Sequence, residues 1–362
     1  MEDRPIQVNL SSTGKEKPKS DELQFGRMFT DHMFVMDYSE PAGWHDARIV
    51  PYQPIAMDPS AMVFHYGQSV FEGLKAYLTP EGDAQLFRPE KNLRRINHSN
   101  DRLCIPRIDE EFALKALKQL IALDKDWIPD AEGTSLYIRP FIISTEAFLG
   151  VAPSRHYKFI VILSPVGAYY KEGINPVKIA VENKYVRAAV GGTGEAKTGG
   201  NYASSLKAQE LVADSGFAQV LWLDAVERKY IEEVGSMNVF FKINGEIVTP
   251  ILNGSILEGI TRKSVIELLK HWEIPVVERK ISMEELYQAY CDGLVEEAFG
   301  SGTAAVISPI GQLTWDDKDM VFNNMETGPI AKKLYDTLTG IQYGKIEDPF
   351  GWIEKIKSRV TL

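Results

Sequence analysis

The chain has 362 residues, 44% of them hydrophobic and 25% charged, and its formal net charge is −10. That length exceeds what one core comfortably holds and suits two domains, while the composition is that of an ordinary globular protein. The basic clusters are short and mixed with acids, so the chain lacks the basic stripe of a nucleic-acid binder. Two distant cysteines exclude a disulfide framework and favour a reducing compartment, and six scattered histidines argue against a zinc site.

The hydropathy and the first residues bear on location. No segment reaches the roughly 20 apolar residues that span a bilayer. The opening stretch, MEDRPIQVNLSSTGKEKPKSDE, has early acids and no apolar core of a signal peptide. We therefore expect a flexible arm over residues 1–25, a cytoplasmic location, and neither a membrane nor a nucleic acid as partner.

In chain order, the first regular pattern is helical. Apolar residues at i, i+3 and i+4 predict helices over 90–103 and 112–127. Apolar runs then predict strands over 135–145 and 156–166, and the second run is apolar almost throughout, which indicates a central strand buried on both faces. Glycine and proline punctuate residues 167–177 and predict a linker there.

The second half mixes strands and helices. A strand run begins at Val177 and extends toward Val190, and Asn244-Gly245 predicts the turn of a hairpin within 238–250. Further helices are expected over 202–214, 261–272, 284–291 and 327–339. Because the elements alternate in clumps and one hairpin is antiparallel, we expect two α+β domains rather than a doubly wound sheet.

The most informative segment is GGTGEAKTGG, residues 191–200. Four glycines (Gly192, Gly194, Gly199 and Gly200) lie within five residues of Lys197, and glycine lets backbone approach a ligand closely. A mobile surface loop is one hypothesis. A phosphate-binding P-loop is a second, although Ala196 replaces the second glycine of that motif and paired glycines after Thr198 are poor helix formers. A lysine that forms a Schiff base is the third.

Seven segments support the third hypothesis through a resemblance. They are HYGQSVFEGLKAY (65–77), LFRPEKNLRRI (86–96), LYIRPFI (136–142), AKTGGNYASS (196–205), EEVGSMNVFF (232–241), LNGSILEGITR (252–262) and FGSGTAA (299–305). Together they resemble the fold-type IV pyridoxal-phosphate enzymes, specifically the branched-chain amino acid aminotransferases. The resemblance implies the α+β, two-domain D-amino acid aminotransferase-like fold, with a smaller N-terminal α/β domain (26–166), an interdomain loop (167–177) and a larger C-terminal cofactor-binding domain (178–362).

The resemblance also implies pyridoxal 5′-phosphate, held as a Schiff base on Lys197. Released as a neutral amine, that lysine would carry a proton between the substrate Cα and the cofactor C4′. Glu233 would pair with the pyridine nitrogen and keep the ring protonated, so that the ring accepts carbanion charge. Tyr202 would hydrogen-bond the phenolic oxygen of the ring.

The phosphate needs donors and positive charge. By resemblance these are the guanidinium fork of Arg95, the amides of Ile260 and Thr261 at a helix start, and Thr303. Further cofactor contacts implied by the motifs are Ser236, Leu257 and Gly259.

Branched-chain substrates call for an apolar wall. By resemblance, the wall comprises Tyr66, Phe71, Tyr137, Leu149, Val151 and Tyr169. The amides of Thr303 and Ala304 would meet the α-carboxylate, and Arg139 would receive the second carboxylate of glutamate. Tyr66 and the loop with Leu149 are expected to reach across the interface of a homodimer, with the active sites near that interface.

The resemblance implies reversible, ping-pong transfer of the amino group of L-leucine, L-isoleucine or L-valine to 2-oxoglutarate. Alternatives with the same fold are a D-amino acid aminotransferase and an aminodeoxychorismate lyase. A P-loop nucleotide binder and a non-catalytic binding protein are alternatives of other classes.

Overall fold

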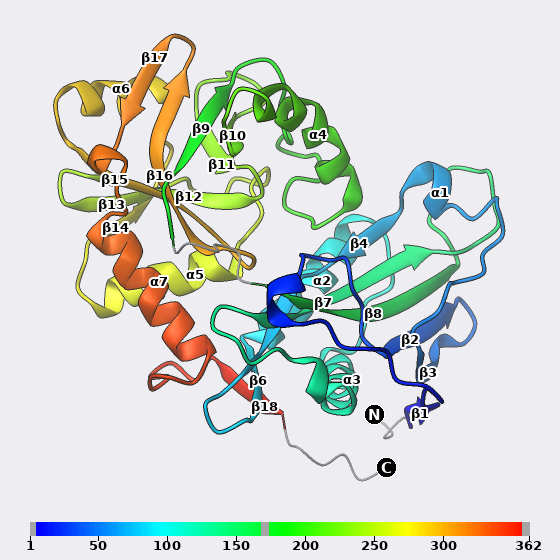
Figure 1. Cartoon of the computed structure of the whole chain (residues 1–362). Helices are drawn as coiled ribbons and strands as arrows, with labels where there is room; N and C mark the ends of the chain where they lie inside the picture. Colours follow the sequence, from blue (N-terminus) through cyan, green and yellow to red (C-terminus); the bar gives the residue numbers. More distant parts are fainter. Residues whose placement is uncertain (1–4, 168–173, 357–362) are drawn as a thin grey trace. The chain divides into compact units, whose positions relative to one another are not determined.

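The structure is a computed structural model, and it describes residues 5–167 and 174–356. The chain forms two compact units, and Figure 1 labels their helices and strands where there is room. Unit 1 comprises residues 1–168, 196–199 and 340–362, and unit 2 comprises residues 169–195 and 200–339. The tetrapeptide 196–199 therefore belongs to unit 1, although the chain on both sides of it belongs to unit 2.

Unit 1 is built on one mixed sheet. Its strands follow the order β1-β3-β2-β8-β7-β5-β6-β18, with β4 paired to β7. They are β1 (Gln7–Val8), β2 (His32–Ser39), β3 (Gly43–Pro51), β4 (Ser69–Phe71), β5 (Leu74–Leu78), β6 (Ala84–Phe87), β7 (Ser135–Ser144), β8 (His156–Val166) and β18 (Ile353–Ile356). The expected central strand is confirmed, because β8 lies between β2 and β7 and most of its residues are buried.

Two helices contribute further residues to the unit 1 core. They are α2 (Pro89–Arg102) and α3 (Glu110–Leu123), and shorter turns are α1 (Val63–Tyr66), η1 (Ser20–Glu22) and η2 (Lys125–Trp127). Helix α3 begins after Asp109, whose carboxylate accepts a hydrogen bond from the Phe112 amide. Its buried residues recur at helical spacing and join one apolar cluster with the sheet: Ala113, Ala116, Leu117, Leu120 and Ile121.

The predicted N-terminal arm makes specific contacts in its described part. Strand β1 pairs in parallel with β3, and the Ser11 amide donates to Nε2 of His32 at 2.9 Å. The Lys15 amide donates to the Asp31 carboxylate at 2.8 Å. These bonds tie the described residues before 16 to the sheet of unit 1.

Unit 2 holds a second mixed sheet, in the order β11-β10-β9-β16-β15-β12-β13-β14, with β17 paired to β16. Its strands are β9 (Val177–Glu182), β10 (Gln219–Leu223), β11 (Ile231–Val234), β12 (Met237–Ile243), β13 (Glu246–Thr249), β14 (Val276–Glu278), β15 (Val295–Gly302), β16 (Val306–Trp315) and β17 (Lys318–Val321). Because β11 also pairs with β12, the path from β11 through β9 and β16 to β12 closes on itself. A closed path leaves no edges among these strands.

The remaining helices are α4 (Gly199–Ala213), α5 (Ile260–His271), α6 (Met283–Cys291), η3 (Asn323–Met325) and α7 (Pro329–Gln342). The predicted helices are thus confirmed to within about four residues at each end, the largest difference being at the C-terminal end of α3. The hairpin is confirmed as well, since Asn244 and Gly245 have φ of 49° and 79°, as a two-residue turn requires. The strand expected from Val177 ends already at Glu182. Within the described ranges, no helix is both long and apolar enough to cross a bilayer.

The predicted domain boundaries differ from the compact units in two places. Residues 340–362 and the tetrapeptide 196–199 fall in unit 1, whereas the sequence placed both in the second domain. Most of the predicted interdomain loop, residues 168–173, lies outside the described residues.

Candidate active site

Lys197 lies on a backbone that is fixed from two sides within unit 1. Its carbonyl accepts a hydrogen bond from the Phe71 amide at 3.0 Å, and Thr198 forms an antiparallel bridge with Val70. On the other side, the Lys197 amide donates to the Ser99 hydroxyl of α2 at 2.9 Å. The ammonium nitrogen lies 4.9 Å from the centroid of the Phe71 ring. The amine is therefore carried by an ordered segment and is not part of a loose surface loop.

Helix α4 begins at Gly199, two residues after Lys197. The expectation that Gly199 and Gly200 would keep a helix from following the lysine is wrong. Glycine weakens helix interiors, but the first-turn amides need no partner inside the helix, so the cost at this position is small. The paired glycines therefore give no argument against a P-loop.

The guanidinium of Arg95 on α2 forms a bidentate ion pair with the buried carboxylate of Glu72. Its Nε and Nη2 donate to the two oxygens of Glu72 at 2.7 and 2.9 Å. Asn92, one turn earlier, donates from Nδ2 to the same carboxylate at 2.7 Å. Burial raises the pKa of Glu72, but the Arg95 guanidinium and the charge of Lys197 outweigh it and hold that pKa below its usual value.

The predicted substrate residues of strand β7 share one face. Arg139 donates from Nη2 to the Tyr137 hydroxyl at 3.0 Å, and its guanidinium carbon lies 4.8 Å from the Phe71 ring centroid. The Tyr137 ring packs edge-on against Phe25 at 4.8 Å between centroids. Phe71, Tyr137 and Arg139 are thus brought together, and Lys197 contacts the same Phe71 ring.

Tyr66 and the loop at 147–151 form an exposed apolar cluster of unit 1. The Tyr66 hydroxyl donates to the Leu149 carbonyl at 2.5 Å. Leu149 is 72% exposed and Val151 is 88% exposed, and Phe64 and Phe148 add further exposed apolar surface. Apolar side chains gathered in this way mark a surface that something covers.

In unit 2, Glu233 is a buried carboxylate, and Arg187 and Asn238 are among its partners. It forms an ion pair with Nε of Arg187 at 2.7 Å and accepts a hydrogen bond from Nδ2 of Asn238 at 3.1 Å. Its neighbour Glu232 has separate partners, the Ser255 hydroxyl and the Asn253 amide. Burial raises the pKa of Glu232 despite these hydrogen bonds. The two acids therefore occupy different surroundings, as alternation along a strand predicts.

Glu233 belongs to a polar row across three strands. It lies opposite Asn238 of β12, which in turn lies opposite Ser301 of β15. Directly paired residues point to the same face of a sheet. The Ser301 hydroxyl is buried and has no hydrogen-bond partner among the described residues. A row with a fixed carboxylate and an unsatisfied hydroxyl suits a polar ligand such as a pyridine ring with its substituents.

The start of α5 suits a phosphate. Gly259 is the N-cap and provides no side-chain cap, and Ile260 and Thr261 form a buried first turn. A Cβ on Gly259 would lie 2.0 Å from Oδ1 of Asn238, so a larger residue there would have to displace the Asn238 amide. Asn238 also donates to the Leu257 carbonyl at 3.0 Å, which fixes the turn against β12. Amides at an uncapped helix start favour an anion.

The other predicted residues occupy less enclosed positions. Tyr202 lies half-buried in the first turns of α4, Ser236 lies in the exposed turn between β11 and β12, and Thr303 and Ala304 follow β15 half-buried. Tyr169 lies outside the described residues. Among the residues that the structure describes, no group of three acids, histidines or cysteines could hold a metal ion.

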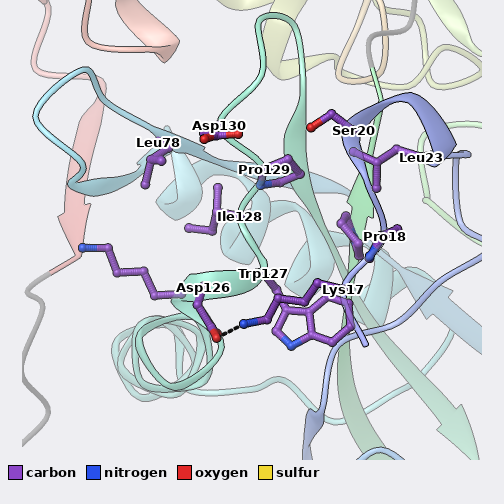
Figure 2. A pocket seen from close by; sticks show the side chains of 12 residues that line it. Lys17, Pro18, Ser20, Leu23, Leu78, Asp126, Trp127, Ile128, Pro129 and Asp130 are labelled. Atoms are coloured by element: carbon purple, nitrogen blue, oxygen red, sulfur yellow. Dashed lines mark hydrogen bonds and ion pairs between the residues drawn. The ribbon is translucent and has the colours of Figure 1, made fainter. Parts of the chain in front are cut away.

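A cavity of about 510 Å³ lies elsewhere in unit 1, between the N-terminal arm and the connection from η2 to β7 (Figure 2). Lys17 and Asp126 form an ion pair on its wall, and Pro129 and Leu78 line it. None of the predicted site residues lines this cavity.

Comparison with known proteins agrees with these features. The family model described as amino-transferase class IV matches residues 69–313, more than half of the chain. Branched-chain-amino-acid aminotransferase 2 of Bacillus subtilis (strain 168) is 68% identical, over 98% of this chain and 98% of its own length. The Escherichia coli branched-chain amino acid aminotransferase superposes with a TM-score of 0.74 at 27% identity, over 90% of this chain and 99% of that chain. The T.th. enzyme of the same name, solved with pyridoxamine 5′-phosphate, superposes with a TM-score of 0.74 at 26% identity, over 89% of this chain and 98% of that chain. The predicted fold-type IV class is confirmed.

The sequence did not single out the partners that hold these residues. Glu72, Asn92 and Ser99 orient Arg95 and Lys197, and Arg187 and Asn238 hold Glu233. Glu72, Asn92 and Asn238 lie inside the recognised motifs, so membership in a motif was the available signal. Nothing in the sequence pairs Glu72 with a residue 23 positions later.

Lys75 generates a prediction about pH. It is 9% exposed, it lies opposite Tyr137 in the β5–β7 register, and burial lowers its pKa to about 8. The native state then loses this proton at lower pH than the unfolded chain, so stability should rise between about pH 8 and pH 10.5. Lys75→Met should add up to about 3 kcal/mol near neutral pH and remove that rise. Urea unfolding at several pH values measures the difference.

The control is Lys355→Met, an exposed lysine on β18 of the same unit. It should leave the pH dependence of stability unchanged. A difference between Lys75→Met and wild type that stays constant from about pH 7 to pH 10.5 would contradict the burial argument.

Proposed function

We propose roles for individual residues of this chain, which belongs to the class IV aminotransferases and is a branched-chain-amino-acid aminotransferase with pyridoxal phosphate as cofactor. The enzyme moves the amino group of leucine, isoleucine or valine to 2-oxoglutarate and back. The observation that carries the assignment is 68% identity over 98% of the chain to an enzyme of that name. The ordered Lys197 segment and the buried Glu233 supply the chemistry that the assignment needs.

Lys197 is the proposed point of covalent attachment and the proton carrier. When bound, the cofactor supplies an electron sink for the negative charge that develops at the substrate Cα. Nζ of Lys197 would hold the cofactor at its aldehyde carbon and, once free of the cofactor, would take the proton from the substrate Cα. The fixed backbone limits the arc over which Nζ moves, which favours transfer between two nearby carbons.

Glu233 is the proposed partner of the pyridine nitrogen. Its ion pair with Arg187 and its bond from Asn238 hold the carboxylate in one orientation inside a buried strand. A carboxylate at that nitrogen keeps it protonated and so strengthens the electron sink. Tyr202 is assigned to the phenolic oxygen.

For the phosphate we propose Arg95, the Ile260 and Thr261 amides, and Thr303. The uncapped start of α5 supports the amides, and the fixed guanidinium supports Arg95. Ser236, Leu257 and Gly259 are the proposed additional cofactor contacts, and Asn238 holds the turn that includes two of them.

The substrate wall is proposed to consist of Tyr66, Phe71, Tyr137, Leu149, Val151 and Tyr169, with the amides of Thr303 and Ala304 at the α-carboxylate. Arg139 is the proposed receiver of the side-chain carboxylate of glutamate. It lies against Phe71 and donates to Tyr137, so one face offers both aromatic surface and a cation.

A homodimer is proposed as the working form, with the active sites near the interface. The exposed cluster of Phe64, Tyr66, Phe148, Leu149 and Val151 supports a partner surface. A cytoplasmic location is also proposed, because both cysteines are free and exposed, as in a reducing compartment.

Replacing Lys197 tests the attachment. Lys197→Ala should lower turnover by a factor of about 10² to 10⁴ or more, because the proton carrier is lost. Sodium borohydride should fix the cofactor covalently to a wild-type peptide that contains Lys197 and leave the variant unlabelled. Lys207→Ala, an exposed lysine of α4 paired with Glu210, should behave as wild type. Label on any other lysine of the wild type would refute the role.

Replacing Arg139 tests the dual pocket. Arg139→Gln should raise KM for 2-oxoglutarate about tenfold or more, because a charge-assisted hydrogen bond is lost. The KM for leucine should change by less than about threefold. Assays with L-leucine, L-glutamate and D-alanine measure this, and Arg48→Gln on β3 is the control. An equal rise of KM for leucine and for glutamate would contradict the proposed role of Arg139. Turnover of D-alanine without leucine would favour a D-amino acid aminotransferase.

Charging the exposed cluster tests the dimer. Val151→Glu should shift the sedimenting species toward the mass of one chain, because a carboxylate would be buried against apolar surface. Val226→Glu is the matched control, since Val226 is 85% exposed and belongs to unit 2, outside the cluster. A wild-type protein that sediments as a single chain at micromolar concentration would refute the dimer.

A further inference from the structure

Glu72 is the most enclosed acid near Lys197, and the proposed mechanism gives it no task. It is 1% exposed and lies in the turn between β4 and β5, directly after Phe71. All of the hydrogen bonds that its carboxylate makes with described residues come from donors: Arg95, Asn92 and the Gly73 amide at 3.1 Å. A buried carboxylate is costly unless it is paired in this way, so its retention here calls for a reason.

The fork fixes one edge of the Arg95 guanidinium. Nε and one N–H of Nη2 point at Glu72, and three N–H groups of the planar guanidinium lie outside this fork. Arginine side chains have several rotatable bonds, and a bidentate carboxylate removes most of that freedom. The remaining edge is therefore presented in a defined direction.

The same side of α2 also holds Lys197. Ser99, one turn after Arg95, accepts the hydrogen bond from the Lys197 amide and donates to the Arg95 carbonyl at 3.1 Å. Asn92, Arg95 and Ser99 follow helical spacing, so one stripe of α2 contacts both Glu72 and the lysine segment. The orientation of Arg95 and the position of Lys197 are thus set by one connected group of side chains.

Charge alone would argue against this arrangement. A carboxylate beside Arg95 offsets the positive charge, so the pair attracts a phosphate dianion less than a lone arginine would. If Arg95 served only as a charge, Glu72 would weaken binding. An acid at this place is useful when the direction of the guanidinium matters more than its net charge.

We infer that Glu72 is a positioning residue for the phosphate of the cofactor, acting through Arg95. The inference rests on the proposed role of Arg95 and extends it to a residue that contacts neither phosphate nor substrate. Arg95 then binds the phosphate with the edge that faces away from Glu72.

The test compares pyridoxal phosphate with pyridoxal, which lacks the phosphate. The ratio of their dissociation constants for the cofactor-free enzyme isolates the phosphate contribution from general effects on the site. Glu72→Asp keeps the charge but withdraws the carboxylate by one methylene, and Glu72→Gln keeps the shape but removes the charge. Both should lower the preference for pyridoxal phosphate by about tenfold, the size expected for lost charge-assisted hydrogen bonds.

A purely electrostatic role gives the opposite pattern, in which Glu72→Asp equals wild type and Glu72→Gln binds pyridoxal phosphate more tightly. Either of those results would overturn the inference. In combination with Arg95→Lys, Glu72→Asp should cause no further loss, since both changes break one fork. An additive loss would also overturn it.

Two further variants complete the design. Glu285→Asp alters the ion pair between Glu285 and Arg279 in unit 2 and should leave the ratio of the two dissociation constants unchanged. Asn92→Ala removes one donor to Glu72 while the ion pair with Arg95 stays, and it replaces the Glu72 variants if those fail to fold. It should lower the preference for pyridoxal phosphate about twofold to threefold, and an unchanged preference would count against the inference. Wild-type enzyme that binds neither compound would contradict the proposed function itself, whereas a strong wild-type preference unaffected in the variants would contradict only the role of Glu72.

Discussion

The backbone hydrogen bonds of Lys197 are the constraint on which the proposed chemistry depends. Residues 196–199 belong to unit 1, where Val70, Phe71 and Ser99 hold the backbone of Lys197 and Thr198. The chain then continues in unit 2 along α4. A lysine side chain has four rotatable bonds, so its amine covers a wide volume unless its Cα is fixed. Fixing the Cα converts a flexible amine into one that can serve two neighbouring carbons in turn.

Each unit contains a buried glutamate that is contacted by an arginine and an asparagine. Glu72 of unit 1 is held by Arg95 and the amide of Asn92, and Glu233 of unit 2 is held by Arg187 and the amide of Asn238. In each case an arginine neutralises the carboxylate and an asparagine fixes its orientation. Removing one partner of such a pair leaves an unpaired buried charge, so these groups constrain sequence change more strongly than exposed pairs do.

Local patterns were sufficient for the elements that local physics determines. The Asn244-Gly245 turn, the apolar strand β8 and the periodic helix α3 were all predictable from spacing alone. The resemblance supplied the fold and the candidate residues. Long-range choices were not predictable: the pairing of Arg95 with Glu72 depends on how α2 packs against the turn after β4, and Gly199 starts a helix because first-turn amides need no internal partner.

Arg139 shows how one face can serve an apolar and an acidic substrate in the proposed pocket. Its guanidinium lies 4.8 Å from the Phe71 centroid and 5.3 Å from the Tyr137 centroid, and its Nε is buried without a hydrogen-bond partner among the described residues. Contact with aromatic faces stabilises a cation without a counter-ion, and arginine is weakly hydrated enough to accept that surrounding. A carboxylate beside Arg139 would neutralise it and remove the attraction for glutamate. If Arg139 receives glutamate as proposed, the aromatic rings would leave its charge available to that substrate while presenting carbon surface to leucine, whereas Arg95 is paired with Glu72.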